Sequence, residues 1–68
     1  MNQEETTPKM YYTIQDIMNM FQISKNVAYR LAKTDGVPCM RLGNAIRFEK
    51  EAFDLWRKKN VSKTVILW

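Results

Sequence analysis

The chain has 68 residues, 46% of them hydrophobic and 26% charged, and this composition suits one globular domain. Eleven Lys and Arg against seven Asp and Glu give a net charge of +4, which on so small a body favours a polyanionic partner. The chain has no His and one cysteine, Cys39, which excludes an internal disulfide, a Cys/His zinc site and His-dependent catalysis.

The same inventory sets expectations for class and location. No apolar run approaches the roughly 18 residues of a membrane span, and the first residues lack the positive region and apolar core of a secretory signal. We therefore expect a cytoplasmic protein that is not an enzyme and that holds no metal ion and no cofactor.

Positive charge is concentrated in the later part of the chain. Residues 25–68 carry ten basic and four acidic residues, whereas residues 1–24 carry one Lys against three acidic residues. The polar residues 1–9 predict a flexible leader, and residues 10–60 predict the folded domain. Residues 61–68 form an apolar tail, β-branched enough to be a strand, which either packs back on the domain or offers an edge to a partner.

A first helix is predicted over roughly residues 14–21. Thr13 can cap its free backbone amides, and Asp16 can return a bond to the Thr13 amide, as in a capping box. Apolar side chains recur at i, i+3, i+4 and i+7, which gives the helix one apolar face: Ile14, Ile17, Met18 and Phe21.

A second helix is predicted from about Lys25 to Lys33 or Thr34, with Ser24 as its cap. One face is apolar: Val27, Ala28, Leu31 and Ala32. The opposite face is basic, able to hydrogen-bond and free of acids: Lys25, Asn26, Tyr29, Arg30 and Lys33. The connection to the first helix is about two residues long, so the two helices must cross steeply, as in a helix-turn-helix.

The remaining elements are a hairpin and a third helix. Residues 39–42 and 45–48 are strand-like, and the Gly43-Asn44 pair between them tolerates positive φ, which predicts a two-stranded hairpin. A third helix begins near residue 49 or 50, with Trp56 as a core anchor. We interpret Met20 and Met40 as gap fillers. The predicted fold class is mainly α with a small β-hairpin, a winged helix-turn-helix.

The outer face of the second helix has the chemistry that a DNA major groove selects. Arg30 can bond a guanine edge with two donors, and Asn26 can do the same at adenine. Phosphates can be held at the helix start by Ser24, Lys25 and Tyr29, and Lys33 extends the basic face. The alternative interpretation of this face is an ordinary solvated helix surface.

The hairpin predicts a second contact with DNA. A narrow tip flanked by arginines can enter a minor groove, where the negative potential is enhanced. The predicted contacts are Arg41, Gly43, Asn44 and Arg47. The alternative is that both arginines cover apolar surface with their stems and that Gly43 only satisfies the turn.

Four segments carry a family resemblance: residues 12–17 (YTIQDI), 24–31 (SKNVAYRL), 38–43 (PCMRLG) and 46–48 (IRF). Over about residues 11–57, the chain resembles the excisionase-type winged helix-turn-helix family, whose members are relatives of the mercury-resistance-type regulators. The resemblance implies a recognition helix over residues 24–33 in the major groove and a wing over residues 41–47 on the backbone or minor groove.

The resemblance also implies a role and partners. Members of the excisionase-type family bend double-stranded DNA beside a recombinase attachment site, often as several cooperating copies, and direct that recombinase toward excision, while other members regulate transcription. In this chain Gln22 stands where the family often has glycine, and a left-handed Gln costs up to about 1–2 kcal/mol. The wing tip is Asn44-Ala45, where the family commonly carries basic residues.

We therefore expect double-stranded DNA as the main partner, with a site-specific recombinase (integrase) and neighbouring copies on DNA as protein partners. A small transcriptional regulator of the same fold is the nearest alternative. A protein-interaction module that uses the apolar tail and never touches DNA is an alternative of another class. A membrane-surface peptide is the weakest one, because the basic helix lacks a large apolar face outside the core.

Overall fold

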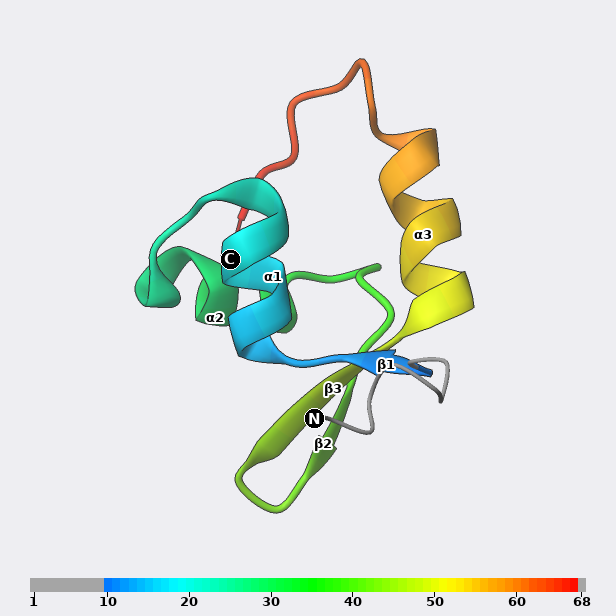
Figure 1. The fold of residues 1–68 in the computed structure, drawn as a ribbon. Helices are drawn as coiled ribbons and strands as arrows, with labels where there is room; N and C mark the ends of the chain where they lie inside the picture. The colour runs from blue at the N-terminus through cyan, green and yellow to red at the C-terminus, as the bar shows by residue number, and fades with distance from the viewer. Residues whose placement is uncertain (1–9, 68) are drawn as a thin grey trace, which may run out of the picture.

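The computed structural model describes residues 10–67, so the predicted flexible leader, residues 1–9, lies outside the described residues, as does Trp68 (Figure 1). The elements follow in the order β1 (Tyr11–Tyr12), α1 (Ile14–Phe21), α2 (Lys25–Lys33), β2 (Met40–Leu42), β3 (Ala45–Glu49) and α3 (Lys50–Lys59). The predicted helices all form at the predicted places, and the winged helix-turn-helix fold is confirmed.

The end of α1 sets the helix-turn-helix. The capping box at its start is present, with the Thr13 hydroxyl accepting from the Asp16 amide at 3.1 Å and the Asp16 carboxylate accepting from the Thr13 amide at 2.9 Å. At its other end Gln22 is left-handed (φ 56°, ψ 51°), and the amides of Gln22 and Ile23 both donate to the Met18 carbonyl. This Schellman-type ending turns the chain before α2 begins, so α1 and α2 stay separate helices (Figure 1).

The sheet has three antiparallel strands in the order β1-β3-β2, where the sequence predicted only the β2-β3 hairpin. The additional strand is β1, in which Tyr11 pairs with Glu49 and Tyr12 pairs with Phe48. A two-residue strand is too short to show an alternating pattern, which is why the sequence did not predict it. Its effect is to join the start of the domain to the end of the wing.

The predicted strand in the apolar tail is wrong for the described part of the tail, since residues 64–67 belong to no helix or strand. The tail instead returns from the end of α3 to the helix-turn-helix (Figure 1), where Leu67 packs against the core. Of the two predicted roles, packing back on the domain is therefore the one observed. The side chains of Val61 and Ile66 stay exposed.

The core lies between the helices and one face of the sheet, and Phe53 of α3 is at its centre. Its buried apolar members among the described residues come from every helix, from β3 and from the connection between α2 and β2: Ile17, Ala28, Leu31, Ala32, Val37, Ile46, Phe48 and Phe53. The Phe53 ring centroid lies 5.3–6.1 Å from four other aromatic rings: Tyr12, Phe21, Phe48 and Trp56. Phe53 therefore joins α3 to both the sheet and α1.

Asp54, next to Phe53, makes a polar connection between α3 and β1. Its carboxylate accepts from the Tyr12 hydroxyl at 3.0 Å and lies 3.3 Å from the Lys50 ammonium and 3.7 Å from the Arg57 guanidinium. Desolvation alone would raise the pKa of Asp54, but hydrogen bonds from Tyr12 and Lys50, together with the positive charges of Lys50 and Arg57, outweigh it and lower that pKa. Burial, together with the bond to Asp54, raises the pKa of Tyr12.

Candidate nucleic-acid interface

Helix α2 is oriented by its apolar face. The Ser24 hydroxyl caps its start by accepting from the Val27 amide at 3.3 Å. Ala28, Leu31 and Ala32 are 0–6% exposed and pack into the core. Because these residues are spaced at i, i+3 and i+4, the other face of α2 must point to solvent.

All six residues predicted for the recognition helix are exposed, as the sequence analysis expected: Ser24, Lys25, Asn26, Tyr29, Arg30 and Lys33. The first turn of α2 holds no acidic residue, and the last turn holds the cations Arg30 and Lys33, where they complement the negative end of the helix dipole. The nearest acidic residue in the sequence, Asp35, lies beyond the end of the helix.

This face has the shape and donors that a major groove accepts. A single exposed helix fits the groove, and the hydroxyl and free amides of its first turn can approach phosphate oxygens. In the same turn Asn26 offers both a donor and an acceptor, and one turn further on the Arg30 guanidinium offers several donors in a planar fork. The arrangement therefore supports base contacts from Asn26 and Arg30 and phosphate contacts from the start of α2.

The hairpin does not bring its two arginines together. Arg41 pairs with Ile46 and Met40 pairs with Arg47, and directly paired residues of antiparallel strands share one face of the sheet. Since Ile46 is buried, Arg41 leaves the hairpin on the face that covers the core, and Arg47 leaves it on the opposite, outer face. The sequence analysis predicted that both arginines flank the tip of the hairpin, because it did not consider the pairing register of the two strands.

The two arginines also differ in their contacts. Arg41 is exposed, whereas Arg47 is half-buried and donates through its guanidinium to the Ile46 carbonyl at 2.9 Å. Gly43, with φ 64°, and Asn44 form the exposed tip between the strands. Among the predicted wing residues, Arg41, Gly43 and Asn44 are therefore accessible to a partner, and Arg47 is engaged with its own strand.

The outer face of the hairpin is more apolar than the sequence analysis predicted. Met40 and Leu42 are 41% and 60% exposed and share this face with Arg47. The interpretation of Met40 as a gap filler is therefore wrong, and the same holds for Met20, which is 40% exposed. The alternation Met40-Arg41-Leu42 was the available signal, since period-two spacing places Met40 and Leu42 on the face opposite Arg41.

Within residues 10–67, no group of three or more potential metal ligands comes together. None of the described helices is both long and apolar enough to cross a membrane.

Comparison with known proteins gives one match. The model of a family described as a helix-turn-helix domain matches residues 11–61, a range that holds every described helix and strand and all ten predicted contact residues. A search of the curated proteins found no match, and neither did a search of the solved structures.

Proposed function

The chain belongs to the helix-turn-helix domain family, and we propose that it is a sequence-specific DNA-binding protein of the excisionase type, which its sequence resembles. It binds and bends DNA beside a recombinase attachment site and directs that recombinase toward excision. The work consists of binding and deformation of DNA, with no bond cleavage by this chain. This role locates the protein with DNA in the cytoplasm.

One observation carries the proposal: the outer face of α2 gathers six exposed hydrogen-bonding or basic side chains without an acidic residue. In the proposed complex α2 lies in the major groove, where Arg30 and Asn26 contact base edges. Phosphates on either side are held by Ser24, Lys25, Tyr29 and Lys33. Base contacts give the sequence preference, and phosphate contacts give most of the affinity.

The wing supports the bending half of the proposal. Arg41, Gly43 and Asn44 are exposed at the end of a two-stranded projection beside the helix-turn-helix. A cation placed in the adjacent minor groove favours a narrow groove and hence a curved duplex. Two neighbouring contacts on one domain then bend the DNA more than either would alone. A recombinase and adjacent copies of this chain are the proposed protein partners.

DNA binding is tested first, by footprinting on the DNA that flanks the gene. We expect a protected site and a log–log salt slope of roughly −4 to −5, which corresponds to four to six phosphate contacts. A nearly flat salt dependence would argue against DNA binding. The matched control is the double variant Asn26→Ala/Arg30→Ala, which should lose the footprint while keeping weak binding to any DNA.

The excision role is tested with the cognate recombinase and a plasmid that carries both attachment sites. Adding this protein should raise the yield of excised circles, and the double variant should not. An unchanged yield, combined with binding at a promoter and altered transcription, would replace the excision role by that of a transcriptional regulator. DNA binding itself would survive that result.

A further inference from the structure

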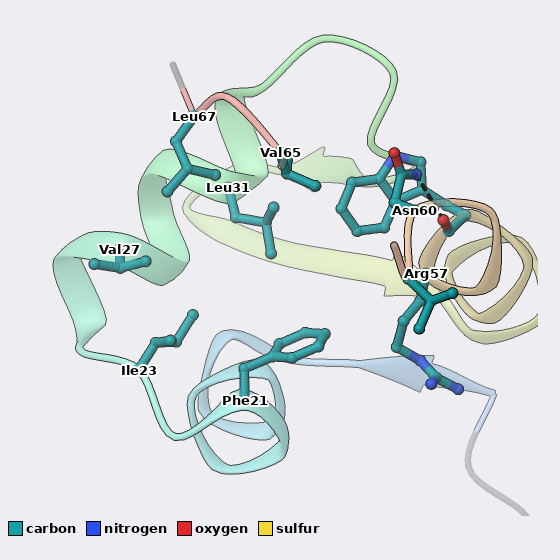
Figure 2. A pocket seen from close by; sticks show the side chains of 10 residues that line it. Phe21, Ile23, Val27, Leu31, Arg57, Asn60, Val65 and Leu67 are labelled. Atoms are coloured by element: carbon teal, nitrogen blue, oxygen red, sulfur yellow. Dashed lines mark hydrogen bonds between the residues drawn. The ribbon is translucent and has the colours of Figure 1, made fainter. Parts of the chain in front are cut away.

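A pocket of about 470 Å³ lies against α2, on the face of the helix that carries Val27 and Leu31 (Figure 2). The helix-turn-helix unit, the last turns of α3 and the tail all contribute to its walls. Figure 2 shows apolar side chains from α1, the turn, α2 and the tail directed toward one another around it: Phe21, Ile23, Val27, Leu31, Val65 and Leu67.

The lining is mostly apolar, which favours an uncharged occupant. Its polar members are Arg57 and Asn60. The Arg57 guanidinium is directed to Asp54, which lies 3.7 Å from its Nη2, and its buried Nε has no hydrogen-bond partner among the described residues. The Asn60 side-chain amide donates to the Trp56 carbonyl at 2.8 Å. Two of the apolar walls are the aromatic rings of Phe21 and Trp56, which favour a flat aromatic molecule.

The size of the pocket is that of a ligand site. Small-molecule sites in proteins are typically mostly apolar clefts or cavities of roughly 300–1,000 Å³. Here about 470 Å³ stays unfilled by residues 10–67 although the tail lies across it.

The tail covers the pocket through two of its side chains. Val65 and Leu67 touch the pocket, while Val61 and Ile66 are 81% and 78% exposed. Residues 64–67 belong to no helix or strand, so an occupant can enter by displacing two side chains without disturbing the sheet or a helix.

We propose that this pocket binds a small, uncharged aromatic molecule, held between Phe21 and Trp56 and covered by the tail. The molecule acts as an effector, because Val27 and Leu31 belong to α2 and their packing fixes the position of that helix. Filling the pocket supports α2 in its place and raises the affinity for DNA. The effector role rests on the proposed function, whereas the binding site does not.

The binding site is tested without DNA. The chain has two tryptophans, so the full-length variant Trp68→Ala leaves Trp56 as the only one, and the neutral probe N-phenyl-1-naphthylamine is added to it. We expect saturable energy transfer from Trp56 to one probe per chain. Probe fluorescence with the unaltered chain should give the same affinity. If only the Trp68→Ala variant binds the probe, the Trp68 side chain is the occupant of the pocket in the unaltered chain, and the proposal is overturned.

Two tail variants, each made in the Trp68→Ala background, locate the probe. Val65→Phe adds a ring inside the pocket and should weaken probe binding by about tenfold or more. Ile66→Phe makes a comparable change one residue further on, at an exposed position, and should leave the affinity within about twofold. Equal binding by both variants, or a signal that rises without saturation, would overturn the site.

Thermal unfolding distinguishes a variant that has lost the probe site from a variant that folds poorly. A ligand of the native state raises the unfolding midpoint, so the probe should raise it more for the Ile66→Phe protein than for the Val65→Phe protein. Equal increases for the two proteins would overturn the assignment to this pocket.

The effector role is tested by titrating DNA with and without saturating probe. We expect the probe to tighten DNA binding by about threefold or more, and DNA to tighten probe binding by the same factor. An unchanged DNA affinity would overturn the effector role. Absence of any DNA binding would instead count against the proposed function, and the Trp56 result would stand.

Discussion

The two parts of the candidate interface, α2 and the β2-β3 hairpin, are both basic, yet they present their charges differently. In α2 the helical period gathers Asn26, Tyr29 and Arg30 on one exposed face. In the hairpin the period of two sends Arg41 and Arg47 to opposite faces, and Arg47 bonds to its own backbone. The hairpin holds two arginines and α2 only one, yet α2 presents the more continuous polar surface. The comparison therefore assigns sequence recognition to α2 and a single cationic contact to the wing.

The largest effect is expected from removing the core packing on which both α2 and the hairpin depend. Phe53→Ala takes away a fully buried ring that contacts four others, and should cost about 3–5 kcal/mol of unfolding free energy. Urea denaturation measures it. Leu55→Ala on the same helix, at a side chain 61% exposed, should stay within about 0.5 kcal/mol; similar losses in the two variants would refute the described core.

Recognition by α2 is tested through Arg30→Ala. Its guanidinium is exposed in the middle of the proposed groove-facing surface, so we expect a loss of about 1–3 kcal/mol on the specific site and a relaxed base preference. Lys25→Ala is the contrast, because a phosphate contact weakens all sequences alike and lowers the salt slope by about 1. Binding titrations on specific and random DNA separate the two. Equal losses on both DNAs for both variants would contradict the roles.

The wing is tested by comparing its two arginines. Arg41→Ala should weaken binding to every sequence and lower the salt slope by about 1, as expected for one lost phosphate or minor-groove contact. Arg47→Ala should leave the slope unchanged, since that guanidinium is engaged with the Ile46 carbonyl. A larger effect at Arg47 than at Arg41 would mean that the hairpin meets DNA with its outer face.

The smallest effect is expected at the polar connection between β1 and α3. Because the pKa of Asp54 is lowered in the folded protein, its charged form stabilises the fold above the unfolded pKa, and this contribution disappears as pH falls through the folded pKa. Asp54→Asn should therefore lower stability at neutral pH and flatten its fall toward acid. Denaturation midpoints over that pH range measure it, with Glu51→Gln, an exposed carboxylate of the same helix, as the control.

The sequence predicted the three helices, the hairpin and the outward face of α2, because caps and apolar spacing are local signals. It missed β1, whose two residues become a strand only by pairing with Phe48 and Glu49, more than thirty positions away. It also missed the split of the wing arginines, since the face taken by Arg41 depends on its register with Ile46. The prediction of a strand in the tail was wrong because the tail packs on the core through the Leu67 side chain, a tertiary contact that its local sequence does not reveal.

The left-handed backbone at Gln22 has a consequence for the evolution of this chain. The bend between α1 and α2 depends on the backbone at that residue and on two amides that share the Met18 carbonyl, not on any side chain proposed to meet a base. A substitution at position 22 therefore changes the stability of the fold and leaves the preferred DNA sequence unchanged, so that these two properties can evolve separately.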